Sequence, residues 1–160
     1  MSGDGRMVMV RFGIRRLFLA MAFFAALGLA CGFDRQEKKV YDDGELLTED
    51  EEAGLQELLV ETADRTEQDL IIVTIRDNGG KESGDFADDF YDRHGFGYEK
   101  KNGSGVLFLI DMDARTFYIR TAGTAIERYT DAEISDTLDA LMPDMRAGDY
   151  AGACANYLQH

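Results

Sequence analysis

The stretch NGSGVLFLIDMDARTFYIRT, residues 102–121, contains two strand patterns joined by a short polar segment. Residues 106–110, VLFLI, form a continuous apolar run that is typical of strands buried on both faces of a sheet. Residues 116–121, TFYIRT, follow as a second strand. The five residues between them, 111–115, fit a hairpin loop, where aspartate is common because its side chain bonds to the local backbone. The stretch therefore predicts a β-hairpin whose first strand lies inside a sheet.

The chain before this hairpin has a strand-then-helix order. Residues 40–42, VYD, are a short strand candidate. Thr48 and Glu51 then form a capping box, which predicts a helix that ends near Arg65. Residues 70–75, LIIVTI, are a second continuous apolar strand, and we expect this strand to run parallel to the strand at 106–110 because a helical crossover separates them.

The remaining elements are helical. A loop over 77–84 precedes a helix from about Asp85 to His94, where Gly95 is a natural stop. His94 lies on the apolar face of this helix, so we interpret it as a structural histidine and not as a catalytic base.

A second capping box, Thr130 with Glu133, opens a helix that we expect Pro143 to break, and a last helix follows Gly148. The order of elements predicts an α/β fold: a three-layer α/β/α sandwich in which a small mixed sheet carries helices on both faces.

The N-terminal segment has the pattern of an export signal. Arginines precede a 14-residue apolar run at 17–30, which is shorter than the roughly 20 residues of a spanning helix. We interpret residues 1–31 as a signal peptide, residues 32–39 as a tether and residues 40–160 as the folded domain. Residues 28–31, GLAC, resemble a bacterial lipobox, which would make Cys31 a lipidation site. Simple cleavage near Ala30 and an uncleaved anchor are the alternatives.

The charge of the chain limits its partners. The formal net charge is −14, and the part after Cys31 carries 13 basic and 30 acidic residues. Such a surface repels nucleic acid and anionic lipid headgroups, and suits divalent cations or basic partners. Solubility alone is the alternative explanation. Cys31 and Cys154 form no disulfide framework, and we expect Cys154 to be a buried, inert thiol.

Acidic residues recur where the predicted strands end. The helix after the strand at 70–75 carries a stripe of acids at helical spacing, namely Asp85, Asp88, Asp89 and Asp92. Asp111 and Asp113 follow a parallel strand of the same sheet. If the strand that ends at Asp42 is also parallel, all three groups meet at one edge, which is the usual ligand crevice of an open α/β sheet. Oxygen ligands suit Ca²⁺ or Mg²⁺. The alternative is that these acids only serve turns and helix starts.

The order and spacing of several short motifs resemble the TPM domain family over about residues 40–158. The family is named after a thylakoid lumen phosphatase-like protein, a photosystem II repair protein and a levamisole-receptor modulator. The matching positions are Val40, Asp42, Leu47, Thr48, the segment ADDFYDRHGFG at 87–97, Asn102, Gly103, Val106, Leu107, Asp113, Arg115, Gly123, Thr130, Asp131, Pro143, Gly148, Asp149 and Tyr150. His94 stands where the family has tryptophan, and Ser104 and Gly105 are inserted.

The resemblance implies an exported α/β/α sandwich, often tied to a membrane. Some members of the family are described as acid phosphatases, some bind calcium in an acidic pocket, and several assist membrane complexes. Carried over to this chain, the pocket residues are Asp42, Asp88, Asp92 and Asp113, to which the strand-end pattern adds Asp111. We expect an anchor, where there is one, to lie at the N-terminus.

Two functions follow from these observations. The first is an extracytoplasmic, membrane-associated module that binds Ca²⁺ and assists envelope or membrane protein complexes. The second is a metal-assisted acid phosphatase, a phosphomonoesterase in which the metal holds the phosphate while an aspartate or a bound water attacks. Arg115 is the nearby cation for that reaction. A purely structural envelope domain is the third possibility.

Overall fold

The computed structural model describes residues 37–159. The predicted signal peptide, Cys31 and most of the predicted tether therefore lie outside the described residues. Lys38–His160 form a compact unit of their own. Among the described residues, no helix is both long enough and apolar enough to span a bilayer.

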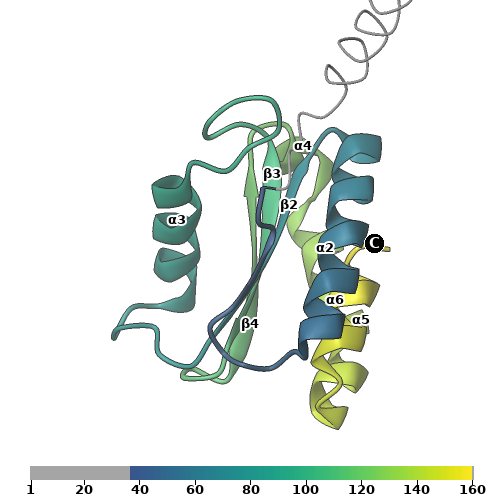
Figure 1. Ribbon diagram of the computed structural model, residues 1–160. Coiled ribbons are helices and arrows are strands. Elements are labelled where there is room, and N and C mark those ends of the chain that lie inside the picture. Colours follow the sequence, from purple (N-terminus) through teal and green to yellow (C-terminus); the bar gives the residue numbers. More distant parts are fainter. Residues whose placement is uncertain (1–36, 160) are drawn as a thin grey trace, which may run out of the picture. The chain divides into compact units, whose positions relative to one another are not determined.

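A four-stranded mixed sheet forms the centre of this unit (Figure 1). Its strands lie in the sequential order β1 (Val40–Asp42), β2 (Asp69–Ile75), β3 (Gly105–Asp111) and β4 (Thr116–Ala122). The first three strands are parallel, and β4 pairs antiparallel with β3. This arrangement confirms the predicted mixed sheet, the hairpin and the parallel pairing of β2 with β3. The direction of β1, which the sequence left open, is parallel as well.

Helices cover both faces of the sheet, which confirms the three-layer sandwich (Figure 1). The helices are α2 (Glu49–Thr66), α3 (Ser83–His94), the single turn α4 (Ala125–Arg128), α5 (Asp131–Ala147) and α6 (Tyr150–Tyr157). Helix α3 lies alone on one face, whereas α2, α5 and α6 lie on the other. The sequence patterns did not predict α4.

Alternating residues of the strands divide the core in two. On β3, Phe108 and Ile110 pack towards α2, α5 and α6, while Leu107 and Leu109 pack towards α3. All seven residues of β2 and all seven of β3 are buried. This explains why both strands have continuous apolar sequences instead of alternating ones.

The two helical crossovers have opposite handedness. Helix α2 connects β1 to β2, and α3 connects β2 to β3, so both move one strand in the same direction across the sheet. Because α2 and α3 lie on opposite faces, one of the two connections must be left-handed, against the strong general preference for right-handed ones. The result places three helices on one face and leaves α3 alone on the other.

Pro143 does not break α5, contrary to the sequence prediction. The side chain of Pro143 is exposed, and the helix continues to Ala147. The turn that follows closes the end of the helix. Gly148, at φ 76°, donates to the carbonyl of Met145, and Asp149 donates to the carbonyl of Asp144.

A buried ion pair holds the start of the sheet together. The Lys39 Nζ lies 2.7 Å from Oδ1 of Asp69, and both residues are buried. The other carboxylate oxygen of Asp69 accepts a hydrogen bond of 2.7 Å from the backbone N–H of Gly97. The pair therefore links the residue before β1, the start of β2 and the loop that follows α3.

We predict that Lys39→Ala destabilises the fold by about 3–5 kcal/mol, because it leaves the carboxylate of Asp69 buried without its cation. Urea unfolding followed by circular dichroism measures this free energy. The control is Lys38→Ala, one residue earlier and exposed, which should cost about 1 kcal/mol or less because its ammonium only lies over the ring of Tyr41. Equal stability of the two variants would contradict the prediction.

Candidate functional site

The carboxyl ends of β1, β2 and β3 lie level at one edge of the sheet. Asp42 is in register with Thr74 on β2, and Ile75 on β2 is in register with Asp111 on β3. Asp42 and Asp111 therefore flank the end of β2, as the parallel arrangement requires. This edge is where ligands bind in open α/β sheets.

Asp111 is the central residue of the edge. Its side chain is fully buried, and the carboxylate accepts four hydrogen bonds. The donors are the Ser83 hydroxyl at 2.6 Å, the Asn78 amide at 3.2 Å, and the backbone N–H groups of Asp113 and Ala114, each at 3.0 Å. The carboxylate thus connects the loop before α3, the first turn of α3 and the β3–β4 loop.

The environment of Asp111 keeps its carboxylate ionised. Burial alone raises the pKa of this group, but the hydrogen bonds from Ser83, Ala114, Asn78 and Asp113 together outweigh burial, and the net pKa is lower than usual. The sequence did not single out Ser83 or Asn78, because the segment 77–84 has the composition of an ordinary polar loop. Only the tertiary structure brings these two side chains to the end of β3.

The carboxylate of Asp42 binds backbone groups of the loop that follows it at the same edge. One carboxylate oxygen accepts from the backbone N–H of Leu46 at 3.0 Å and also from the hydroxyl of Thr74. The other oxygen accepts from the N–H of Leu47 at 2.9 Å. The side chain therefore fixes the loop that leads from β1 into α2.

Asp88 and Asp92 are directed towards β4 and not towards the edge. Asp88 accepts from Nε of Arg120 at 2.7 Å, and Asp92 accepts from a terminal nitrogen of Arg120 at 3.2 Å. The guanidinium also lies over the ring of Tyr91, 4.1 Å from its centroid. Arg120 therefore pairs with both acids, which leaves one net negative charge in the group, and links α3 to the sheet.

The five predicted ligands accordingly separate into three groups. Asp111 and Asp113 share the β3–β4 loop, Asp42 lies across β2, and Asp88 and Asp92 hold Arg120. The carboxylate of Asp113 is exposed. Within residues 37–159, no group of three or more histidine, cysteine or acidic side chains is arranged to hold a metal ion.

Among the described residues, Cys154 and His94 are held in structural environments. Cys154 is fully buried, as expected, and burial raises the pKa of its thiol to about 12. His94 is exposed; its ring stacks on Phe96 at a centroid distance of 5.1 Å, and its Nδ1 lies 2.9 Å from the carbonyl oxygen of Phe90. That contact fits a structural histidine.

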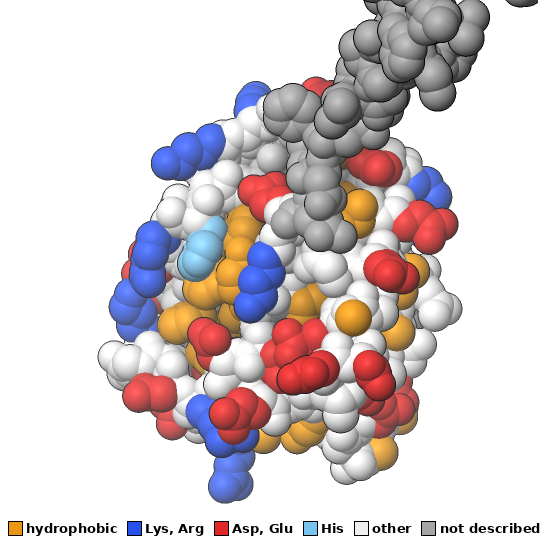
Figure 2. All heavy atoms as spheres, in the orientation of Figure 1, with side chains coloured by type: hydrophobic (Ala, Val, Ile, Leu, Met, Phe, Trp, Pro, Cys, Tyr) orange, Lys and Arg blue, Asp and Glu red, His pale blue; other side chains and the backbone are white. Residues whose placement is uncertain are grey.

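The surface of the domain is rich in acids beyond the edge itself. The first turn of α2 carries four acidic residues in a row, at positions 49–52. Figure 2 shows red side chains gathered where α2 begins. The negative potential at the strand edge is therefore reinforced by a neighbouring helix start.

The fold and the edge define a class of protein: small α/β/α sandwiches in which carboxylates stand at the carboxyl end of a mixed sheet. A family model described as TPM domain matches residues 40–160. The chain belongs to the TPM domain family, as its motifs predicted.

A relative from Bacillus subtilis agrees with this assignment. The chain is 26% identical over 149 residues to UPF0603 protein YdjH of Bacillus subtilis, covering 91% of this chain and 56% of that protein. It therefore spans little more than half the length of this relative.

Solved structures share the fold. The N-terminal domain of a Porphyromonas gingivalis protein (P.gingivalis) has a TM-score of 0.67 at 23% identity, covering 79% of this chain and 80% of that one. The BA42 protein of Bizionia argentinensis has a TM-score of 0.62 at 17% identity, covering 72% and 78%.

We predict that Asp111→Asn destabilises the domain by about 2–3 kcal/mol at neutral pH, since an amide cannot accept all four hydrogen bonds. The native pKa of Asp111 is lowered, so its stabilisation is complete above the unfolded pKa of about 4 and is lost as the pH falls through the native value. The stability difference between wild type and variant should therefore narrow below about pH 4.

Urea unfolding from pH 3 to 8 in calcium-free buffer measures this difference. The matched control is Asp113→Asn, whose carboxylate is exposed and which should change stability by about 0.5 kcal/mol or less. A pH-independent difference for Asp111→Asn would show that the charge of Asp111 does not stabilise the fold.

Proposed function

We propose that the chain acts outside the cytoplasm as a membrane-associated TPM-domain module, which binds Ca²⁺ weakly at the carboxyl edge of its sheet and assists envelope or membrane protein complexes. The observation that carries this proposal is the β3–β4 loop. The buried carboxylate of Asp111 fixes this loop, and the loop presents the exposed carboxylate of Asp113 at the edge.

The hydrogen bonds of Asp111 and Asp113 assign them different roles in the proposed site. A carboxylate has about four lone-pair positions, and Asp111 already accepts four hydrogen bonds. In the proposal, Asp111 therefore organises the loop, and Asp113 contacts the cation together with backbone carbonyls and water. Asp88 and Asp92 are not ligands in this arrangement, because both carboxylates are paired with Arg120.

Such a site is expected to be weak. Calcium takes six to eight oxygen ligands, and a site with one free carboxylate relies on neutral oxygens for the rest. Extracellular calcium modules have dissociation constants of about 0.1–1 mM, which suits a compartment with abundant calcium. The predicted export signal at the N-terminus supports this location, and the net charge of −14 supports attraction of cations to the surface.

We expect Ca²⁺ at about 10 mM to raise the Tm of the full chain by about 5 °C, because the cation binds only the folded state. Asp113→Asn should lose most of this increase. The matched control is Asp88→Asn, an identical acid-to-amide change on α3, which should keep it.

Calorimetric titration provides the second measurement on the same three proteins. Absence of heat and of any Tm increase in the wild type would exclude the calcium site. A calcium-induced Tm increase that is lost in Asp88→Asn but kept in Asp113→Asn would place the cation on α3 instead.

Metal-assisted phosphatase activity is the second candidate, favoured by the exposed Arg115, which lies two residues after Asp113 in the same loop. A cation bound near Asp113 and the guanidinium of Arg115 would together bind a phosphate group. Hydrolysis of a chromogenic phosphate monoester that requires calcium or magnesium and is lost in Asp113→Asn would support the catalytic function. Equal rates for wild type and variant would remove this residue from the mechanism.

A further inference from the structure

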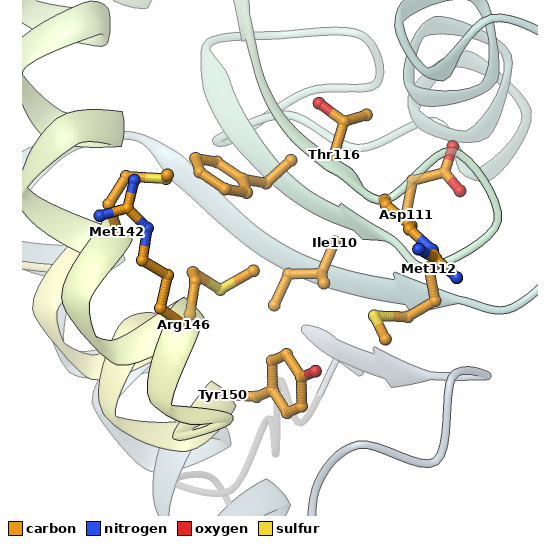
Figure 3. Close-up of a pocket in the computed structure, with 10 residues that line it drawn as sticks. Ile110, Asp111, Met112, Thr116, Met142, Arg146 and Tyr150 are labelled. Carbon is orange, nitrogen blue, oxygen red and sulfur yellow. The ribbon is translucent and has the colours of Figure 1, made fainter.

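A pocket of about 550 Å³ lies on the face of the sheet that carries α5 and α6 (Figure 3). It opens between the β3–β4 hairpin and the last turns of α5. Its apolar lining consists of Ile110, Met112, Phe117, Met142, Met145 and Tyr150. The volume is within the range of about 300–1,000 Å³ that is typical of small-molecule sites.

The pocket is separate from the acidic edge. Asp111 is the one acidic residue in its lining, but the carboxylate of Asp111 bonds to Ser83 on the α3 side of the sheet. In Figure 3 this carboxylate points away from the hollow, whereas Ile110 and Tyr150 point into it. The carboxylate of Asp111 therefore does not contribute to the inside of the pocket.

The apolar lining can adapt to the shape of a ligand. Three of its side chains are methionines, which are flexible and polarisable and can follow the shape of a ligand. Met112, Met142 and Met145 are all half-buried, so each presents part of its thioether to the hollow. The aromatic rings of Phe117 and Tyr150 are half-buried as well, and they provide rigid walls.

Two arginines give the pocket a charge opposite to that of the rest of the domain. Arg115 lines it from the hairpin loop and Arg146 from the last turn of α5, and both are exposed. Within residues 37–159, neither guanidinium forms an ion pair. In a chain with a net charge of −14, two unpaired cations beside one apolar hollow favour an anion with an apolar body.

We propose that this pocket binds an amphipathic carboxylate: a ligand with an alkyl chain that packs on the methionines and a carboxylate head that pairs with Arg115 on the hairpin side of the opening. Arg146 lies on the α5 side of the opening and adds to the positive potential around it. The alkyl chain removes half-exposed apolar surface from water. The planar guanidinium group of Arg115 matches the geometry of a carboxylate, so the head binds at the hairpin end of the pocket.

Decanoate is the probe for the test, and methionine methyl NMR on the purified full chain is the measurement. The chain has seven methionines, of which three line the pocket and four, Met1, Met7, Met9 and Met21, precede residue 32. The methyl signals of Met112, Met142 and Met145 should shift together and saturate as decanoate is added. The four N-terminal methyl groups serve as internal references and should not follow the same curve.

Variants and probes of altered charge distinguish specific binding of the carboxylate from nonspecific partition of the alkyl chain. Arg115→Gln should raise the dissociation constant for decanoate by about fivefold or more, because a charge-assisted hydrogen bond is lost. The matched control is Arg93→Gln, an exposed arginine on α3 at the opposite face, which should leave the constant unchanged. Decyltrimethylammonium, with the same chain length and the opposite charge, should not produce saturable shifts in the pocket methyls.

Three results would overturn the proposal. The first is the absence of saturable shifts at the three pocket methionines. The second is equal binding of decanoate and decyltrimethylammonium. The third is an unchanged decanoate constant in a double variant, Arg115→Gln with Arg146→Gln, whose amide spectrum shows that it is folded.

Discussion

The buried carboxylate of Asp111 is the constraint on which the functional edge depends. A buried anion is tolerated only when its lone pairs are satisfied, and the four donors of Asp111 come from three separate segments. The loop before α3, the first turn of α3 and the β3–β4 loop must therefore keep their relative positions for the fold to remain stable. One ionised side chain thus determines how the loop that carries Asp113 and Arg115 is presented.

The alternation of side chains along the β3–β4 hairpin places different chemistry on the two faces. Asp111 and Arg120 face α3, where one carboxylate organises the edge and one guanidinium binds the acids of the helix. Ile110 and Phe117 face α5 and α6, where they line the apolar pocket. Because a strand alternates with a period of two, neighbouring residues of one hairpin contribute to two unrelated environments.

Much of the fold could be predicted from local patterns. The apolar runs at 70–75 and 106–110, the capping box at Thr48 and the hairpin all have short-range causes, so a single sequence reveals them. Pro143 was misjudged because its side chain is exposed, where the helix tolerates the loss of one backbone hydrogen bond and continues to Ala147.

The site was less predictable because its contacts are non-local. The helical spacing of Asp88 and Asp92 correctly placed them on one face, but nothing near them in sequence indicates Arg120, which lies 28 residues beyond Asp92. Ser83 and Asn78 were missed for the same reason, since their role exists only once α3 packs beside the end of β3. The pocket arises where α5, which packs mainly on α6, leaves the end of the hairpin uncovered, and no local sequence pattern describes such a gap.

The two proposed sites meet in the β3–β4 loop, and this has a consequence for how they would work together. Asp113 is proposed to contact the cation, and Arg115, two residues later at φ 53°, is proposed to hold the carboxylate. Both residues belong to a four-residue turn whose backbone amides bind Asp111. A cation at Asp113 removes the negative charge closest in sequence to Arg115, which favours an anion there. Since coupling between two binding sites is reciprocal, the anion would favour the cation to the same extent.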